Sequence, residues 1–151
     1  MNMQDVFQEA CRFGHIAVVK ALLADKRVDP TDDDNCAIRW ASYYGRIEVV
    51  KALLADKRVD PNYAIRLASY YGHTEVVKAL LADKRVDPTA MDNYAIRYAS
   101  RNGRIETVKV LLADKRVDPT ARNNEAIRDA GWNGRTEVVK LLETSIKELV
   151  S

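Results

Sequence analysis

The chain has 151 residues, of which 47% are hydrophobic and 30% are charged, and its formal net charge is +2. This hydrophobic content is enough for a packed core, and the near balance of acids and bases excludes a protein that binds nucleic acid or an acidic membrane chiefly by charge. No apolar run is long enough for a signal peptide or a membrane-spanning helix, and the two cysteines, Cys11 and Cys36, are too few for a disulfide framework. We therefore expect a soluble cytoplasmic or nuclear protein.

One string of thirteen residues is present three times without change. It is Val-Val-Lys-Ala-Leu-Leu-Ala-Asp-Lys-Arg-Val-Asp-Pro, and its copies end at Pro30, Pro61 and Pro88. A near copy occupies residues 107–119. Repetition at a short period indicates an array of small units, each of which chiefly contacts its neighbours.

A glycine in every unit gives the period. Successive glycines are 31, 27, 31 and 31 residues apart, at Gly14, Gly45, Gly72, Gly103 and Gly134. Four residues separate Pro30 from Asn35, whereas Pro61 is followed directly by Asn62, so the link between the second and third units lacks four residues. We predict one domain of five units, at about residues 4–31, 32–61, 62–88, 89–119 and 120–151.

Each unit is predicted to contain two short helices, and the fourth unit shows the pattern. Asn93 is a candidate N-cap, the apolar residues of 95–99 recur at helical spacing, and Gly103 is expected to end the first helix in the left-handed conformation. The second helix carries an apolar stripe at 108–112, and the chain leaves it before Pro119. Residues 144–150 are expected to extend the last helix as a lid. Helices this short are marginal alone, so stacking must stabilise them.

The unit resembles the ankyrin repeat, whose first helix ends in Ala-Ala-x-x-Gly-His and is followed by Glu-Ile-Val and a Leu-Leu pair. Residues 68–73, 75–77 and 80–81 read Ala-Ser-Tyr-Tyr-Gly-His, Glu-Val-Val and Leu-Leu. The family's Thr-Pro-Leu-His opening is replaced by Tyr-Ala-Ile-Arg at residues 63–66, a variant similar to repeats in large arrays of giant viruses and protists. The resemblance covers residues 4–145 and implies an all-α solenoid of five helix-turn-helix units. Its β-hairpin loops are expected to be short or vestigial, and absent after Pro61.

The resemblance also implies that partners bind the concave face, which the first helices and the loops form. In designed members of the family, the two residues before the glycine are among those varied to create binding surfaces. Here these positions vary among the units while the framework is nearly constant. They are Arg12, Phe13, Tyr43, Tyr44, Tyr70, Tyr71, Arg101, Asn102, Trp132 and Asn133.

All seven tyrosines lie in the predicted first helices of the middle three units. Tyrosine and tryptophan are frequent binding anchors, because they offer a large, stiff contact area with a polar tip. We predict that the pairs at 43–44 and 70–71 form a binding hot spot. The other aromatic residues of these helices are expected to pack between neighbouring helices, and they are Trp40, Tyr63, Tyr94 and Tyr98.

Each unit after the first has one arginine where the family usually has histidine: Arg39, Arg66, Arg97 and Arg128. We call this set the arginine ladder. Such a row could bind phosphate groups, but we favour a structural role, in which each arginine binds loop carbonyls or an aspartate of a neighbouring loop such as Asp60. The Lys-Arg pairs at 26–27, 57–58, 84–85 and 115–116 are expected to be solvated helix ends.

Catalytic constellations are missing from the sequence. His15 and His73 lie at equivalent sites of different units, without a carboxylate or cysteine at metal-ligand spacing, and are expected to be surface residues or to bind loop carbonyls. We find no nucleophile motif or phosphate-binding loop, so no catalysis, cofactor or metal is expected.

We therefore predict a monomeric, non-catalytic protein-protein interaction module with no affinity for nucleic acid or membranes. Two alternatives stay open. One is an engineered or consensus ankyrin scaffold with no native partner, which the unchanged copies of the thirteen-residue string would suit. The other is binding of RNA or a phosphorylated ligand through the arginine ladder.

Overall fold

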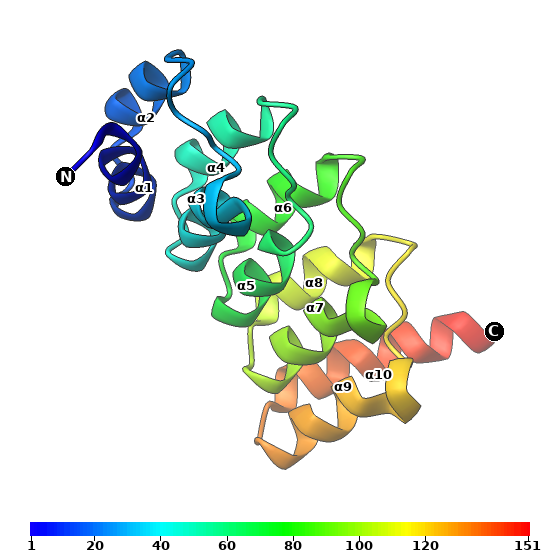
Figure 1. Ribbon diagram of the computed structural model, residues 1–151. Helices are drawn as coiled ribbons and strands as arrows, with labels where there is room; N and C mark the ends of the chain where they lie inside the picture. Colours follow the sequence, from blue (N-terminus) through cyan, green and yellow to red (C-terminus); the bar gives the residue numbers. More distant parts are fainter.

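The computed structural model describes residues 1–151 and contains ten helices and no strand. The helices form five pairs, as the repeat predicts, and the pairs are stacked along one direction with the termini at opposite ends (Figure 1). The first helices of the pairs are α1 (Met3–Phe13), α3 (Asp32–Tyr43), α5 (Ala64–Tyr71), α7 (Ala90–Arg101) and α9 (Ala121–Trp132). The second helices are α2 (Ile16–Leu23), α4 (Ile47–Leu54), α6 (Thr74–Ala82), α8 (Ile105–Ala113) and α10 (Thr136–Val150).

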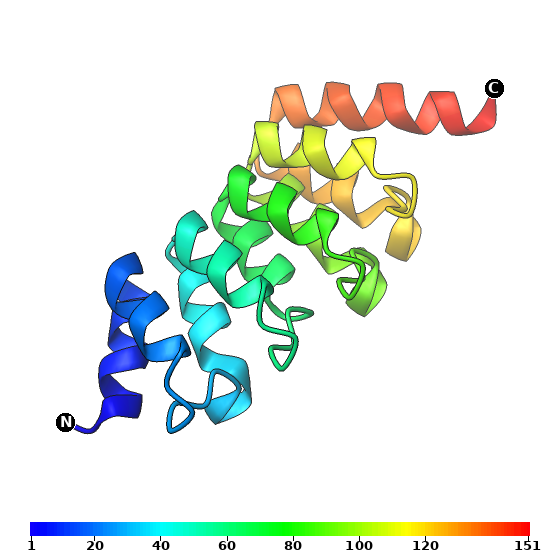
Figure 2. The ribbon, with the colours of Figure 1, turned by 90° about the horizontal axis from the view of Figure 1, so that it is seen from above.

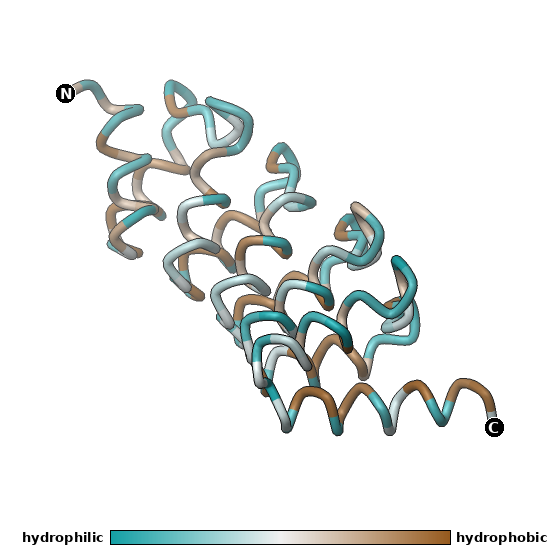
Figure 3. Tube along the Cα trace, turned by 90° about the horizontal axis from the view of Figure 1, so that it is seen from below, coloured by the Kyte–Doolittle hydropathy of each residue, from teal (hydrophilic) through white to brown (hydrophobic).

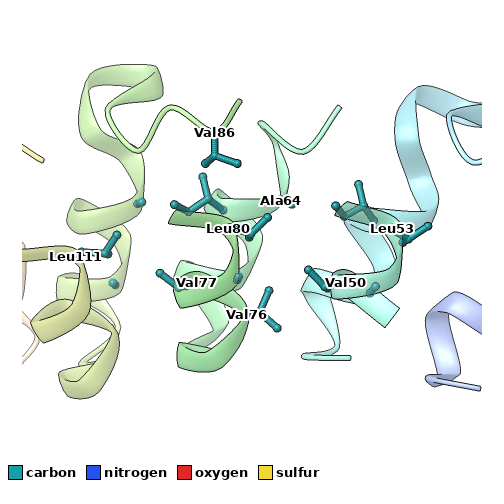
Figure 4. Close-up of a cluster of buried hydrophobic side chains, with 14 of the residues drawn as sticks. Val50, Leu53, Ala64, Val76, Val77, Leu80, Val86 and Leu111 are labelled. Carbon is teal, nitrogen blue, oxygen red and sulfur yellow. The ribbon is translucent and has the colours of Figure 1, made fainter. Parts of the chain in front are cut away.

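The helices form two layers, one of first helices and one of second helices (Figure 2). One continuous cluster of buried hydrophobic residues runs through the stack from Phe7 in α1 to Leu142 in α10. Val50 and Leu53 of α4, and Val77 and Leu80 of α6, belong to this cluster (Figure 4). The loops between units are mostly hydrophilic (Figure 3). Each unit therefore completes its core only against its neighbours.

A glycine in the left-handed conformation ends the first helix of every unit, as predicted. Gly45 has a φ of 68° and Gly134 a φ of 69°. A Cβ atom on Gly45 would lie 2.6 Å from Nδ1 of His73 in the next unit, whereas one on Gly134 would have no neighbour within 4 Å. Inside the stack, the glycine therefore also makes room for a side chain of the following unit.

A left-handed turn, rather than a hairpin, forms where three of the links between units enter the first helix, within the first residues of α3, α7 and α9. The residues at 33–35 have φ values of 50°, 55° and 59°, and those at 91–93 and 122–124 adopt the same conformation. The short link after Pro61 has no such turn, and α5 begins at Ala64. Because α5 still packs against both α3 and α7, the four missing residues remove a turn without interrupting the stack.

The prediction that Asn93 caps its own helix is wrong. Asn93 lies within the left-handed turn, with a φ of 59°, and its Oδ1 accepts a hydrogen bond of 2.8 Å from the backbone N–H of Asp118. Asn35 accepts an equivalent bond from Asp60. The asparagine thus ties the start of a unit to the loop that leaves the same unit.

The expectation that the Lys-Arg pairs are only solvated is wrong for two of the arginines. Arg85 donates hydrogen bonds of 2.7 and 2.8 Å to the carbonyl oxygens of Val59 and Leu54 in the preceding unit. Arg116 makes the corresponding bonds to the third unit. Arg58 makes none to the first unit and pairs only with its own aspartate. These arginines couple the middle units to one another.

The last helix is extended by residues 144–150, as predicted, but these residues do not form a lid. Leu149 and Val150 at its end are 62% and 83% exposed. None of the ten helices combines the length and the apolar character that crossing a membrane requires.

Candidate functional site

Seven aromatic side chains form a continuous row along α3, α5 and α7, which we call the aromatic row. Consecutive ring centroids in it lie between 4.1 and 6.0 Å apart. In order, its members are Trp40, Tyr44, Tyr43, Tyr71, Tyr70, Tyr98 and Tyr94. The four tyrosines of the predicted hot spot therefore have their rings in contact and lie in the middle of the row.

Helical spacing and helix packing together place these rings. Residues three and four apart share one face of a helix, which sets Trp40 beside Tyr43 and Tyr44. The row crosses from α3 to α5 where the ring centroids of Tyr43 and Tyr71 lie 4.3 Å apart. Both rings are half-buried. A side-chain hydrogen bond with Tyr43 raises the pKa of Tyr71 to about 12.

Of the four aromatic residues that we expected to pack between neighbouring helices, only two are half-buried. Tyr94 and Tyr98 are half-buried and stacked at 4.1 Å, as expected of packing residues, and burial raises the pKa of Tyr94. Trp40 is 39% exposed and stacks on Tyr44, so it extends the candidate surface. The four-residue spacing of Trp40 and Tyr44 could have indicated this. Tyr63 is 43% exposed and lies outside the row.

Of the two predicted positions in the first unit, Arg12 contacts one end of the aromatic row. Its guanidinium carbon lies 5.2 Å from the ring centroid of Trp40, and the guanidinium donates a hydrogen bond of 3.4 Å to the hydroxyl of Tyr44. Contact of a cation with an aromatic face is favourable, so Arg12 continues the surface toward α1. Phe13, next to it, is 51% exposed.

The four predicted positions of the last two units do not form a further cluster with the aromatic row. The side-chain amides of Asn102 and Asn133 each donate to the backbone carbonyl four residues earlier, at 2.9 and 2.7 Å. These two residues therefore end their own helices. The guanidinium carbon of Arg101 lies 5.9 Å from the centroid of Tyr98, at the edge of the row. Trp132 is 78% exposed and lies apart from the row.

Contacts from the following unit fix the backbone beneath the tyrosine pairs. The Nε2 of His73 lies 2.8 Å from the carbonyl oxygen of Tyr43, so this histidine binds a backbone carbonyl, at the end of α3 rather than in a loop as predicted. Arg104, its counterpart in the next unit, donates from Nε to the carbonyl oxygen of Tyr70 at 3.2 Å. These bonds hold the end of each first helix in place, so the rings above them sit on a fixed backbone.

The arginine ladder is structural at three of its four positions, where it binds backbone carbonyls, one of the two kinds of acceptor that we predicted. Arg97 is 5% exposed, donates to the carbonyl oxygens of Met91 and Asp92 at 2.9 Å each, and forms an ion pair of 2.9 Å with Glu125. Two further members donate to carbonyls of the left-handed turn in their own units, namely Arg39 and Arg128. The ladder therefore does not present four free guanidinium groups. Arg66, in the unit without the turn, is the exception.

Two segments of the chain, residues 2–65 and 65–148, match a family model that is described as ankyrin repeats (3 copies). Together they span nearly the whole chain. A comparison with curated proteins found no match.

Proposed function

The chain belongs to the ankyrin repeat family, whose members typically serve as non-catalytic interaction modules, and on this premise we propose that it binds another protein through the face of its first helices. By the family resemblance this face is the concave one. The proposed contact surface is centred on Tyr43, Tyr44, Tyr70 and Tyr71, with Trp40 and Arg12 at one end.

The aromatic row is the observation that supports this proposal. Its rings come from three consecutive first helices and contact one another, while Tyr43, Tyr70 and Trp40 each keep part of their surface open to solvent. Rings that are already fixed by their neighbours lose little side-chain entropy when a partner binds. Large aromatic anchors also contribute most of the binding energy in many protein interfaces.

The second helices carry no aromatic side chain. Their exposed sides carry lysine and glutamate pairs three residues apart, such as Glu75 with Lys78 at 2.9 Å and Glu106 with Lys109 at 3.1 Å. Exposed pairs of this kind contribute little to stability and are well hydrated, which disfavours their burial in an interface. Because all rings of the aromatic row belong to one chain, the proposed surface is complete in a monomer.

Affinity capture with mass spectrometry tests the proposal. The variant Tyr43→Ala, Tyr44→Ala, Tyr70→Ala and Tyr71→Ala should fail to retain the proteins that the wild type captures from a lysate of the source organism. The matched control, Lys51→Ala with Lys78→Ala on the second helices, should retain them. A second variant with phenylalanine at the four tyrosine positions preserves ring packing and separates loss of contact area from loss of the hydroxyl groups. Circular dichroism checks that each variant is folded. Unchanged capture by a folded alanine variant would show that the proposal is wrong.

A further inference from the structure

Arg66 differs from the rest of the arginine ladder in its partners. Each of the other three ladder arginines donates to at least one backbone carbonyl oxygen of its own unit. Arg66 has neither an oxygen acceptor nor an ion pair, and its only hydrogen-bond partner is the Sδ of Met91. Its Nε atom is shielded from solvent and has no partner. A thioether is a weak acceptor, so most of the donor capacity of this guanidinium is not used within the protein.

The short link after Pro61 explains this difference. In the second unit, Arg39 donates hydrogen bonds to the carbonyl oxygens of Asp33 and Asp34, in the left-handed turn. The third unit lacks the four residues that form the turn, so it lacks these carbonyl oxygens but keeps the arginine. The deletion therefore releases one member of the ladder from its structural role.

Arg66 lines a hollow of about 250 Å³ between α5 and α7. The other residues around the hollow are Tyr63, Leu67, Tyr70, Tyr71, Met91 and Tyr94. The guanidinium carbon lies 4.0 Å from the ring centroid of Tyr63 and 6.0 Å from that of Tyr94, so two rings hold it in place. No acidic residue is among those that line the hollow.

We propose that this hollow binds the side-chain carboxylate of an aspartate or glutamate in a partner protein, with Arg66 as its ion-pair partner. A guanidinium presents its N–H groups as a planar fork that matches the two oxygens of a carboxylate, and such pairs are stronger in surroundings of low polarity. The inference rests on the proposed function, because Tyr70 and Tyr71 belong both to the hollow and to the aromatic row. A partner segment lying on the row would place an acidic side chain within reach of Arg66.

Charge balance favours a carboxylate over a phosphate group. One guanidinium neutralises one carboxylate, whereas a phosphate monoester carries about −1.5 to −2 charges at neutral pH. The excess negative charge would lie among tyrosine rings, whose faces are themselves electronegative. RNA would need several successive cations, and the ladder arginines on either side of Arg66, Arg39 and Arg97, already have protein acceptors.

The test uses 3-phenylpropanoate as the probe, with 3-phenylpropanamide and phenyl phosphate for comparison. Binding is followed by NMR at the Nε–H of Arg66 and the ring signals of Tyr63. The acid should bind wild-type protein about tenfold or more tightly than the amide, since only the acid forms charge-assisted hydrogen bonds with Arg66. Arg66→Gln should reduce the affinity for the acid to that for the amide. Lys84→Gln, which removes a positive charge from an exposed loop residue, should bind like the wild type.

A second variant restores the turn and leaves Arg66 in place. Inserting Thr-Ala-Met-Asp, the sequence of residues 89–92, between Pro61 and Asn62 should give Arg66 its carbonyl acceptors and abolish the preference for the acid. If this variant does not fold, Arg66→Gln alone decides the outcome. Three results would overturn the inference: no binding of the acid, equal binding of acid and amide, or tighter binding of phenyl phosphate than of the acid. A folded insertion variant that keeps the preference would also overturn it. None of these measurements uses the partner protein. A negative result would therefore overturn only the carboxylate site, and the proposed function would still be tested separately by affinity capture.

Discussion

The ring centroids of Tyr43 and Tyr71 lie 4.3 Å apart, across the one link in the stack that lacks the left-handed turn. This contact joins the tyrosine pair of α3 to that of α5. Because the helices pack side by side whether or not the turn is present, the deletion leaves the row of rings unbroken while it changes the surroundings of Arg66. The shortened link thus leaves the proposed surface continuous and leaves Arg66 without the turn carbonyls that bind the other ladder arginines.

We expect Tyr71 to ionise at a higher pH than a tyrosine that is free in water. A side-chain hydrogen bond with Tyr43 raises the pKa of Tyr71 from the usual 10.0 to about 12. Because folding favours the protonated phenol, its contribution to stability is present below about pH 10 and is lost as the pH rises toward 12. In a spectrophotometric titration Tyr43→Phe should lower the pKa of Tyr71, and Tyr44→Phe should leave it unchanged. Identical curves for Tyr43→Phe and the wild type would exclude the hydrogen bond as the cause.

The glycines inside the stack should tolerate a side chain less well than the last glycine. Alanine at Gly45 or at Gly134 must adopt the left-handed conformation, which costs about 1–2 kcal/mol in either place. At Gly45 the new Cβ would also lie 2.6 Å from the imidazole of His73 and displace it from the carbonyl of Tyr43. We expect Gly45→Ala to lower the free energy of unfolding by about 1–2 kcal/mol more than Gly134→Ala, as measured by urea denaturation. Equal losses would mean that the space beside Gly45 is unimportant.

Arg85 and Arg58 provide a matched pair for the coupling between units. Both form an ion pair of 2.7 Å with an aspartate two residues earlier, but only Arg85 also binds two carbonyl oxygens of the preceding unit. Hydrogen bonds from a charged group contribute about 1.5–3 kcal/mol each. Arg85→Ala should therefore destabilise the protein in urea by at least about 1.5 kcal/mol more than Arg58→Ala. A difference near zero would show that these bonds do not couple the units.

The asparagines of the left-handed turns also provide a matched pair, one with a hydrogen-bond partner and one without. Asn93 accepts a hydrogen bond of 2.8 Å from Asp118, whereas the buried Oδ1 of Asn124 has no partner, because α10 runs on where other units turn away. Both residues have a φ near 60°, so replacement by alanine strains the backbone equally. Asn93→Ala should lower the melting temperature more than Asn124→Ala, by an amount that corresponds to about 1 kcal/mol. The reverse order would contradict the assigned role of Asn93.

The features that the sequence predicted are those that depend on residues close together in the chain. The repeat period, two helices per unit and the left-handed glycines follow from local rules, such as the apolar spacing around Ile96 and the backbone freedom of Gly103. The helical content and the absence of strands agree with them.

The features that could not be predicted depend on contacts between residues that are far apart in the chain, within a unit or between units. The bond from Asp118 to Asn93 and the bonds from Arg85 to the second unit join residues about 25 to 31 positions apart. The deletion after Pro61 is visible in the sequence, but its effect on Arg66 is not. That effect requires knowing that the turn carbonyls are the acceptors of Arg39 and Arg97.

The central claim is that the face of the first helices is the binding surface. Hydrogen exchange on the complex with a captured partner tests this claim most directly. Mass spectrometry of peptides from the free and the bound protein would locate the partner's footprint. We predict slower exchange in residues 39–44 and 67–71, with unchanged exchange at the exposed sides of α4 and α6. Protection confined to the second helices, with no change around Tyr43 and Tyr71, would contradict the account.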